Sequence, residues 1–377
     1  MGLTLSHQSA LDALRMFRRG GENPKEIDMT RIACPSPWVG KRWTMREFDE
    51  SIWRWPRPQR GAHLHALTPT RVGRVRLQNV ETHLLCRDLP AGSVLWLDER
   101  ATMVCPELLF LQMADSFSLP ALVMLGYELC GHFSRDARNP LRGKVSLDVP
   151  AATSVERLRD YLSKSKGLWG IKQARIALQY LSNNALSPME AVLATVYWLP
   201  SEEAGYDMGP ITLNERVCVG EAGELRRTRS RYPDLSFSFA PLGINYDGAD
   251  HLDLPGLVEA AQQAATAEGD EGDEAKLALE EKTIAVRAKY VDDMRRNRQL
   301  ASGGRLVFPV TKEDLCGKDG LDNLTREILQ CARNLFGVDT TRYERILEDT
   351  SRAAERKVLL ESLLPIGAVK GMMYGRL

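Results

Sequence analysis

Two spacings of apolar residues recur along the chain, one typical of helices and one typical of strands. Near the start, four apolar residues of the segment 6–19 share one helical stripe, and Ser6 stands where a helix N-cap is expected. Those four residues are Ala10, Leu11, Leu14 and Phe17. Strand-like runs and further apolar helices, two of them divided at Pro120, continue to about residue 182. The pattern predicts a mixed α/β domain over residues 1–182.

The pattern after residue 182 gives one clear order of elements. An apolar helical segment at 187–200 precedes three strand-like runs, a long helical segment and a last strand. The three runs are 211–219, 232–239 and 241–248, the long helix is 283–302, and the last strand is 305–310. This αβββαβ order predicts a second domain over residues 183–317. Helical spacing beyond it predicts a helical C-terminal extension over residues 318–377.

A strongly acidic stretch lies inside the second domain. Residues 268–281 contain seven acidic residues and one lysine. A segment of this composition buries too little apolar surface to offset the conformational entropy lost when it becomes ordered. We therefore predict that residues 266–282 form a solvated, weakly ordered insertion.

Composition and charge narrow the choice of function class only slightly. The chain has 377 residues, enough for two or three domains, and 44% of them are hydrophobic. Because 50 basic residues balance 50 acidic residues, the overall charge does not mark a nucleic-acid-binding protein, and such a role must come from local patches. The start of the chain has no signal-peptide pattern, and no apolar run approaches the roughly 20 residues that span a bilayer. We expect a cytoplasmic protein without a membrane partner.

The cysteines are scattered and give no metal-binding spacing. No pair has the C-x-x-C spacing, so we expect reduced thiols and no zinc held by cysteine. The seven are Cys34, Cys86, Cys105, Cys130, Cys218, Cys316 and Cys331.

Polar side chains gather on two of the predicted strands. Side chains alternate along a strand, so Asp234 lies on the face opposite Leu235, and Asn245 and Asp247 share one face of the next strand. If these strands pair, the three polar residues meet at one edge of the sheet, and Glu190 on the preceding helix is able to reach the same place. Oxygen ligands of this kind suit Mg²⁺ or Mn²⁺, which can position water and stabilise charge on a phosphodiester.

The order and spacing of these residues resemble the PD-(D/E)xK nuclease superfamily, and within it the short-patch mismatch-repair endonuclease-like branch. The resemblance covers about 130 residues, and a later D-x-x-R-x-x-x-L pattern fits the same branch. The matching positions are Glu190, Pro233-Asp234, Asn245-Tyr246-Asp247-Gly248 and His251, followed by Asp293, Arg296 and Leu300. The resemblance implies a restriction-endonuclease-like core that acts on DNA. It also implies catalytic residues Glu190, Asp234, Asn245, Asp247 and His251, with Glu190, Asp234 and Asp247 as ligands of Mg²⁺ or Mn²⁺.

The sequence departs from the family at two positions of the motif. Asn245 stands where the family has a strand glutamate, and Asp247 stands at the position of the superfamily's lysine. His251 is able to act as a general base in place of that lysine, because an unperturbed imidazole titrates near neutrality. Two interpretations follow: a Mg²⁺-dependent DNA nuclease or nickase of bacterial defence, or a catalytically inactive nuclease-fold protein that binds nucleic acid or a partner. A third interpretation is an interaction protein with no nucleic-acid role.

Each motif residue also has a purely structural interpretation. Ser187 and Glu190 fit a capping box, with Pro188 at the first helical position. Asp234 follows a proline and fits a turn, and the pair Asp247-Gly248 is a strong turn signal. His251 is equally consistent with a surface loop.

The N-terminal segment resembles AbiE-type abortive-infection antitoxins over about 130 residues. Residues 5–15, LSHQSALDALR, are similar to the SH-x-SAA-x-L-x-G stretch of that family, and 63–114 resemble its strand region and following helix. The winged helix that precedes this region in those antitoxins has no counterpart in the sequence, so we expect no autonomous operator binding. The resemblance implies a protein partner of toxin type.

A basic, tryptophan-containing stretch lies in the same segment. Residues 41–76 contain nine basic and three acidic residues around Trp43, Trp53 and Trp55. Basic side chains neutralise phosphates and aromatic rings stack on unpaired bases, so the stretch is a candidate nucleic-acid contact. The alternative is a basic surface over a tryptophan-containing core. The candidate contact residues are Arg54, Arg57 and Arg60, together with Arg296 of the second domain.

Four residues of the N-terminal segment have spacings that zinc sites use. They are His63, His65, His83 and Cys86, and the first two share a face if they lie on a strand. Ordinary strand histidines are much more common than zinc ligands, so we expect no zinc site here.

Overall fold

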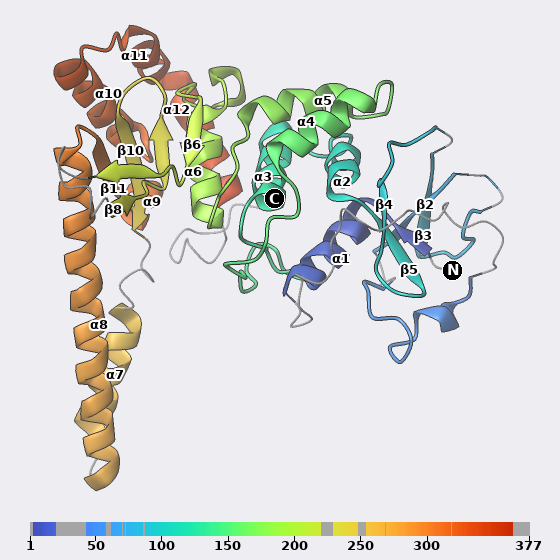
Figure 1. The fold of residues 1–377 in the computed structure, drawn as a ribbon, viewed down its shortest axis with the longest axis horizontal. Helices are drawn as coiled ribbons and strands as arrows, with labels where there is room; N and C mark the ends of the chain where they lie inside the picture. Colours follow the sequence, from blue (N-terminus) through green and yellow to red (C-terminus); the bar gives the residue numbers. More distant parts are fainter. Residues whose placement is uncertain are drawn as a thin grey trace. The chain divides into compact units, whose positions relative to one another are not determined.

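The computed structural model describes residues 3–19, 43–57, 62–69, 71, 73–85, 87–219, 229–247, 254–267, 269–317 and 319–364. The chain is mixed α/β and divides into two compact units, Met1–Thr195 with Ser362–Leu377 and Val196–Glu361 (Figure 1). The boundary falls inside helix α6 (Pro188–Trp198), 13 residues after the predicted end of the first domain. No helix in the described part of the chain is long and apolar enough to cross a membrane.

The first unit is built on a five-stranded mixed sheet. Its strand order is β3-β2-β1-β5-β4, with β1 antiparallel to β2 and parallel to β5. The strands are β1 (Leu3–Leu5), β2 (Leu64–Thr68), β3 (Val80–Leu84), β4 (Val94–Trp96) and β5 (Ala101–Val104). The helices are α1 (His7–Arg19), the 3-10 turn η1 (Met45–Phe48), α2 (Pro106–Met113), α3 (Leu119–Cys130), α4 (Val155–Lys164), α5 (Ile171–Ala177) and the 3-10 turn η2 (Leu178–Tyr180).

Local sequence signals explain where several of these helices begin. The two apolar helices predicted around Pro120 are confirmed as α2 and α3, and Pro120 lies in the first turn of α3, where its missing N–H costs nothing. Ser118 caps α3, and Ser154 caps α4 by accepting a hydrogen bond from the Arg157 N–H.

A buried ion pair fastens α1 to α3. The Arg15 guanidinium donates from Nε and Nη2 to the two carboxylate oxygens of Glu128, at 2.9 and 2.7 Å. Arg18, one turn later, donates to the carbonyl oxygens of Glu128, Gly131 and Pro150. Burial acts to raise the pKa of Glu128, but the adjacent Arg15 outweighs it and lowers that pKa to about 2. The pair is therefore charged in the folded protein at every pH above that value.

We predict that Glu128→Gln lowers the free energy of unfolding by about 3–5 kcal/mol, because it leaves a buried guanidinium without its counter-charge. Urea denaturation at pH 7 measures this. The exposed pair Asp160–Lys164 provides the control, since Asp160→Asn removes an i,i+4 pair worth about 0.3–0.5 kcal/mol. Because folding lowers the Glu128 pKa from 4.5 to about 2, its contribution is complete above pH 4.5 and disappears as the pH falls towards 2. Equal losses in the two variants would contradict the prediction.

The second unit holds a four-stranded mixed sheet in the order β11-β10-β9-β6. Strands β6, β9 and β10 are antiparallel neighbours, and β11 runs parallel to β10. The bounds are β6 (Ile211–Leu213), β9 (Leu235–Phe237), β10 (Leu242–Asp247) and β11 (Leu306–Thr311), with a separate two-stranded ribbon of β7 (Val217–Val219) and β8 (Arg229–Arg231). Each predicted strand-like run contains a strand: the run 211–219 holds β6 and β7 with a gap between them, the run 232–239 holds β9 at its centre, and the run 241–248 holds β10.

The second unit also contains helices that precede, interrupt and follow the strands of this sheet in the sequence. A short 3-10 turn, η3 (Ser201–Glu203), follows α6, and two long helices separate β10 from β11. These are α7 (Leu254–Thr266) and α8 (Gly269–Ser302), and the later helices are α9 (Lys312–Cys316), α10 (Asp322–Phe336), α11 (Thr341–Glu348) and α12 (Thr350–Leu363).

The helices after residue 318 are joined to the rest of the second unit by a buried polar network. Arg356 of α12 makes two hydrogen bonds to the Asp322 carboxylate of α10, at 2.9 and 2.7 Å, and Tyr206 donates its hydroxyl to the same carboxylate at 2.6 Å. Residues 319–361 therefore belong to the compact unit that contains the sheet.

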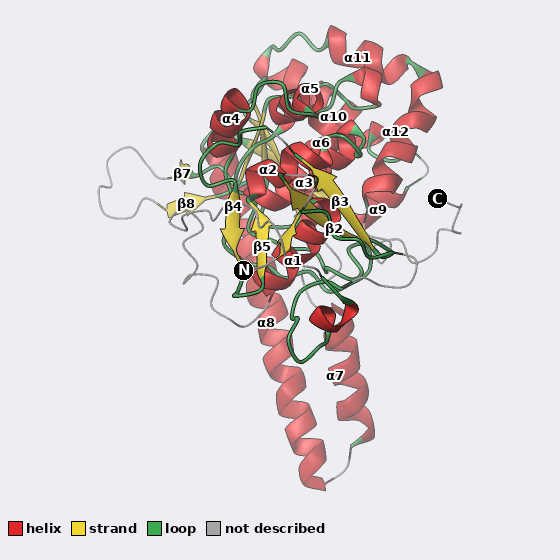
Figure 2. Ribbon diagram, turned by 90° about the vertical axis from the view of Figure 1, so that its right-hand side faces the viewer, coloured by secondary structure: helices red, strands yellow, loops and turns green. Residues whose placement is uncertain are grey.

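The prediction of a weakly ordered acidic insertion is wrong for residues 269–281, which form the first part of α8. Helix α7 lies alongside this part of α8 (Figure 2), and the Lys282 ammonium donates to the Gly256 carbonyl oxygen at 3.0 Å. Four of the acidic residues, Asp270, Glu271, Asp273 and Glu274, lie in the first two turns of α8, near the positive end of the helix dipole. The alanine, leucine, glutamate and lysine residues of this stretch all favour helix. The composition argument failed because it left out a neighbouring helix.

Candidate functional site

Two residues of the predicted nuclease motif are held together where β9 and β10 begin to separate. Gly243 pairs with Ser236 and Ile244 with Leu235, which puts Asn245 opposite Asp234. The Asn245 Oδ1 atom accepts a hydrogen bond from the Asp234 backbone N–H at 3.1 Å, and the Asp234 Oδ2 atom accepts one from the Tyr246 N–H at 2.7 Å. Each side chain thus bonds to the backbone of the other strand, and the juxtaposition expected from strand alternation is present.

Asn245 is also the link between this edge of the sheet and α8. It is 1% exposed, and its Nδ2 atom donates to Asn297 Oδ1 at 3.4 Å. A glutamate at this position would bring a buried charge beside the Asp234 carboxylate, whereas the amide brings none. Position 245 is therefore occupied by a neutral group that bridges β9, β10 and α8.

The other acidic motif residue in this part of the sheet is Asp247. Asp247 ends β10 opposite Thr311 of β11, on the same side of the strand as Asn245 by alternation, and it is partly buried. Asp234 and Asp247 are the two strand carboxylates left for a divalent cation. His251 and Gly248 lie outside the described residues.

Glu190 belongs to the first unit and has a complete structural role there. Its carboxylate accepts hydrogen bonds from the Ser187 hydroxyl and the Leu186 N–H, both at 2.9 Å, and the Ser187 hydroxyl oxygen accepts one from the Glu190 N–H at 3.2 Å. The bond from the Glu190 N–H to Ser187 is the one expected of the capping box that the sequence indicated, while the carboxylate accepts from the Leu186 N–H, one residue before the N-cap. The assignment of Glu190 to a metal site stays a prediction.

The D-x-x-R-x-x-x-L pattern lies on α8 and contributes to packing and charge pairing. Arg296 forms an ion pair with Asp293 at 3.3 Å, and Leu300 is fully buried. Arg231 of β8 makes two hydrogen bonds to the Asp292 carboxylate, at 3.1 and 3.2 Å, which lower the pKa of that carboxyl group. The bonds of Arg231 thus tie α8 to the small ribbon.

This half of α8 is rich in basic residues. Residues 287–298 contain five basic residues and two acidic ones. Arg295 and Arg298 are exposed, and they flank Asn297, whose side chain contacts Asn245. An exposed positive turn therefore lies directly beside the altered motif.

The basic stretch of the first unit contains buried tryptophans. Trp43 and Trp53 pack edge-to-face with centroids 5.9 Å apart, and Trp55 donates its indole N–H to Asp98 at 2.5 Å. The three tryptophans are 7%, 2% and 9% exposed, which leaves no room for nucleic-acid bases to stack on their rings. The prediction of base stacking on these tryptophans is therefore wrong. Their burial supports the alternative of a tryptophan-containing core.

The candidate arginines of that stretch differ in their surroundings. Arg54 is exposed with its guanidinium 5.9 Å from the centre of the Trp55 ring, and Arg57 forms an ion pair with Glu50. Arg60 lies outside the described residues. A phosphate contact by Arg54 or Arg57 stays a prediction.

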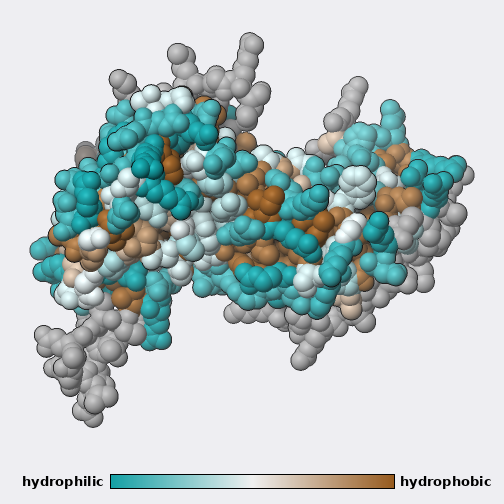
Figure 3. Space-filling model, turned by 90° about the horizontal axis from the view of Figure 1, so that it is seen from above, coloured by the Kyte–Doolittle hydropathy of each residue, from teal (hydrophilic) through white to brown (hydrophobic). Residues whose placement is uncertain are grey.

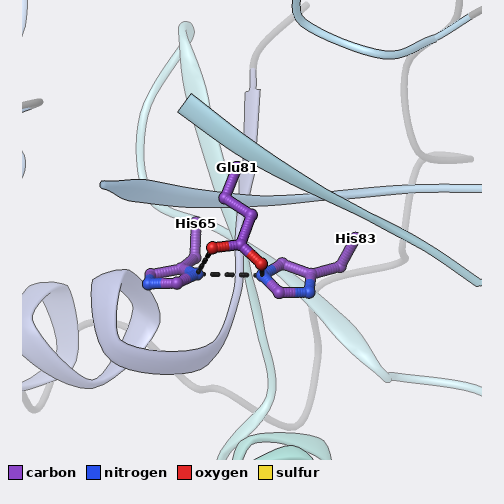
Figure 4. Close-up of side chains that lie close together, drawn as sticks. All are labelled: His65, Glu81 and His83. Carbon is purple, nitrogen blue, oxygen red and sulfur yellow. Dashed lines mark hydrogen bonds and ion pairs between the residues drawn. The ribbon is translucent and has the colours of Figure 1, made fainter. Parts of the chain in front are cut away.

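A second cluster, which sequence reasoning only partly found, lies on the sheet of the first unit. Strands β2 and β3 are parallel, with His65 opposite Glu81 and Leu67 opposite His83, so the side chains of His65, Glu81 and His83 share one face (Figure 4). The His65 Nδ1 and His83 Nε2 atoms are 2.9 Å apart, and each lies 3.8 Å from a Glu81 carboxylate oxygen. We call these three residues the β2–β3 cluster.

Burial keeps the imidazoles of this region neutral. It lowers the pKa of His65 and of His83, although the Glu81 carboxylate opposes the shift in both. His7, at the start of α1, stacks on His83 with ring centroids 3.8 Å apart, and burial together with the two other histidines lowers its pKa to about 3. All three rings therefore have a lone pair available at neutral pH.

The four-residue zinc pattern considered from sequence is only partly realised. His65 and His83 do meet, but their third neighbour is Glu81, and Cys86 lies outside the described residues. Glu81 could have been found from its spacing, because it stands two residues before His83 in the run Val80–Leu84 and so shares its strand face. Of the described cysteines, Cys105, Cys130, Cys316 and Cys331 are free thiols.

Comparison with known proteins adds no assignment: no family model, curated protein or solved structure matches this chain.

The hydrogen bonds of Asn245 generate a prediction about charge. We predict that Asn245→Asp keeps the bond from the Asp234 N–H but destabilises the fold as the pH rises above about 4, because a second buried carboxylate then ionises beside Asp234. Folding raises the pKa of the new carboxyl group, so the penalty is absent below the unfolded-state pKa and grows above it. Thermal unfolding between pH 3 and 8 measures the effect, and Asn297→Ala, which removes only the weak bond to α8, serves as the control. A pH-independent difference from wild type would contradict the prediction.

Proposed function

We propose that the second unit is a restriction-endonuclease-like module that binds nucleic acid and has lost efficient cleavage. The order of its elements supports this proposal. From the last turn of α6, the chain supplies the sheet strands β6, β9 and β10, then α8 and the strand β11, with the three antiparallel strands adjacent in the sheet and the fourth parallel to the third. With the ribbon β7–β8 and the helix α7 counted as insertions, this order is similar to the αβββαβ order that the resemblance to PD-(D/E)xK nucleases implies.

The observation that carries the proposal is the hydrogen-bonded pair of Asp234 and Asn245. It occupies the place where the resemblance puts the metal-binding strand residues, but Asn245 is buried, uncharged and engaged by backbone and Asn297. A divalent cation there would meet two strand carboxylates instead of three. Loss of one charged ligand weakens cation binding, while the polar scaffold that holds the strands is kept.

The exposed basic turn of α8 supports a binding role. Arg295 and Arg298 project from the helix that carries Asn297, next to the altered motif. Basic side chains on a helix beside a polar sheet edge are suited to phosphate oxygens, and such contacts supply most of the affinity of sequence-independent binding. The neutral overall charge is compatible with this arrangement because the proposed contact is local. On the face seen in Figure 3, hydrophilic residues surround the hydrophobic areas.

The second candidate function is a Mg²⁺- or Mn²⁺-dependent nuclease or nickase. The two retained carboxylates, Asp234 and Asp247, favour it, with Glu190 and His251 as the further residues that the resemblance assigns. Cleavage and binding assays separate the two functions.

We predict that wild-type protein incubated with Mn²⁺ cuts plasmid DNA no faster than Asp234→Ala. Asn245→Glu restores the acidic strand residue of the family and should bind Mn²⁺ more tightly than wild type, which titration calorimetry measures. Wild-type cleavage that disappears in Asp234→Ala would replace the binding proposal with the enzymatic one.

We also predict that the full chain binds a DNA duplex in low salt and that Arg295→Ala combined with Arg298→Ala weakens this binding. Each lost phosphate contact should reduce the slope of log K against log salt concentration by about 1. Fluorescence anisotropy at several salt concentrations measures both quantities. Arg326→Ala, an exposed arginine of α10 hydrogen-bonded to Asn323, is the matched control and should bind like wild type. Identical salt slopes in all three proteins would exclude this turn as the contact.

A further inference from the structure

We propose that His65, Glu81 and His83 of the β2–β3 cluster form a binding site for one divalent transition-metal ion, with zinc as the ion that fits best. Zinc takes imidazole nitrogen and carboxylate oxygen ligands, whereas Mg²⁺ and Ca²⁺ prefer oxygen alone. The site is in the first unit and is independent of the function proposed for the second. Within the described residues, this is the group of histidine, cysteine and acidic side chains whose candidate ligand atoms all lie within 4.8 Å of one another.

The geometry of the three ligand atoms is close to what zinc requires. Zinc–nitrogen and zinc–oxygen bonds of about 2.0–2.1 Å in a tetrahedron place ligand atoms about 3.3–3.4 Å from one another. The observed separations are 2.9 Å between the two nitrogens, 3.8 Å from His65 Nδ1 to Glu81 Oε2 and 3.8 Å from His83 Nε2 to Glu81 Oε1. These distances bracket that value, and a shift of the Glu81 carboxylate towards the nitrogens brings an oxygen within reach of an ion held by both histidines. The Glu81 side chain is 53% exposed and is free to make such a shift.

The backbone fixes the three ligands on one surface. His65 and Glu81 are register partners on parallel strands, and His83 follows Glu81 on the same face. The His65 strand is held at its start by α1, since the His65 N–H donates to the Ser9 hydroxyl at 2.8 Å and the Ser6 N–H donates to the His65 carbonyl at 3.0 Å. The ligands are thus placed before any metal arrives, which reduces the ordering that binding requires.

The charges of the surroundings also favour a cation. Each histidine offers a ring-nitrogen lone pair to a metal ion. Glu81 supplies one negative charge against the two positive charges of the ion.

A cavity beside the cluster gives the ion a place to meet a ligand. His83 and His7 line a cavity of about 390 Å³ whose other walls include Leu67, Leu108 and Trp169. Three protein ligands leave a fourth tetrahedral position for water or another donor, which is the arrangement of catalytic zinc sites. The mainly apolar lining of the cavity suits a small organic molecule that carries one metal-binding group.

The test uses the full chain after treatment with a chelator. Titration with Zn²⁺ should show one equivalent bound tightly, and Co²⁺ in its place should give the visible absorption of a four- or five-coordinate ion. His65→Ala and His83→Ala should each weaken zinc binding by more than about 100-fold, because loss of even an outer-shell partner typically costs 10–100-fold. His132→Ala removes a histidine of the same unit outside the cluster and should bind like wild type. Mg²⁺ should not compete.

Thermal unfolding of the metal-free proteins checks that the histidine variants remain folded. Glu81→Gln is the safer variant, since its side chain is half exposed, and it should bind zinc more weakly than wild type while unfolding at the same temperature. Absence of stoichiometric zinc binding to wild type, or equal binding to wild type and to the His65→Ala and His83→Ala variants, would overturn the proposal. The cluster would then be a hydrogen-bonded pair of imidazoles. Either outcome leaves the DNA-binding assays of the second unit unaffected.

Discussion

The buried ion pair between Arg15 and Glu128 is the interaction on which the first unit depends. It holds α1 against α3, and Arg18 adds three hydrogen bonds to carbonyl oxygens around the end of α3. The other end of α1 then lies beside β2, where its first residues bond to the backbone of His65 and place His7 against His83. The position of the β2–β3 cluster is thus fixed by a charge pair at the far end of the same helix.

The second unit also contains a buried charged group that has a charged partner, the Asp322 carboxylate of α10. Asp322 accepts hydrogen bonds from Arg356 and Tyr206, and this network joins the late helices to the segment after α6. At the sheet edge, by contrast, the buried polar residue is the neutral Asn245. A charged group at that position would need a charged partner of the kind that Asp322 has. The Asn245 oxygen instead accepts from a neutral donor, the Asp234 backbone N–H. A buried carboxylate is therefore found where Arg356 pairs with it, and a neutral amide is found where Asn245 has no charged partner among the hydrogen bonds of the described residues.

Sequence patterns predicted local structure and neighbouring strands well. Period-two alternation correctly put Asp234 and Asn245 together, because the pairing of β9 with β10 depends on residues only about ten positions apart in sequence. The capping signal at Ser187 and Glu190 was equally local. By contrast, the order in the acidic part of α8 depends on α7, and the burial of Trp43, Trp53 and Trp55 depends on tertiary packing. Composition does not report such contacts. The meeting of Glu81 with His65 required knowing that β2 and β3 are adjacent and parallel, which spacing alone does not give.

The place of β1 in its sheet has a consequence for how the protein is made. This strand, Leu3–Leu5, is the middle strand of five, and its parallel neighbour β5 begins at Ala101. Strand β1 therefore stays unpaired on that side until the roughly one hundred residues that separate it from β5 have been synthesised, and α1 meets Glu128 later still. Closure of such distant contacts is slow, and the incomplete chain exposes apolar strand edges meanwhile.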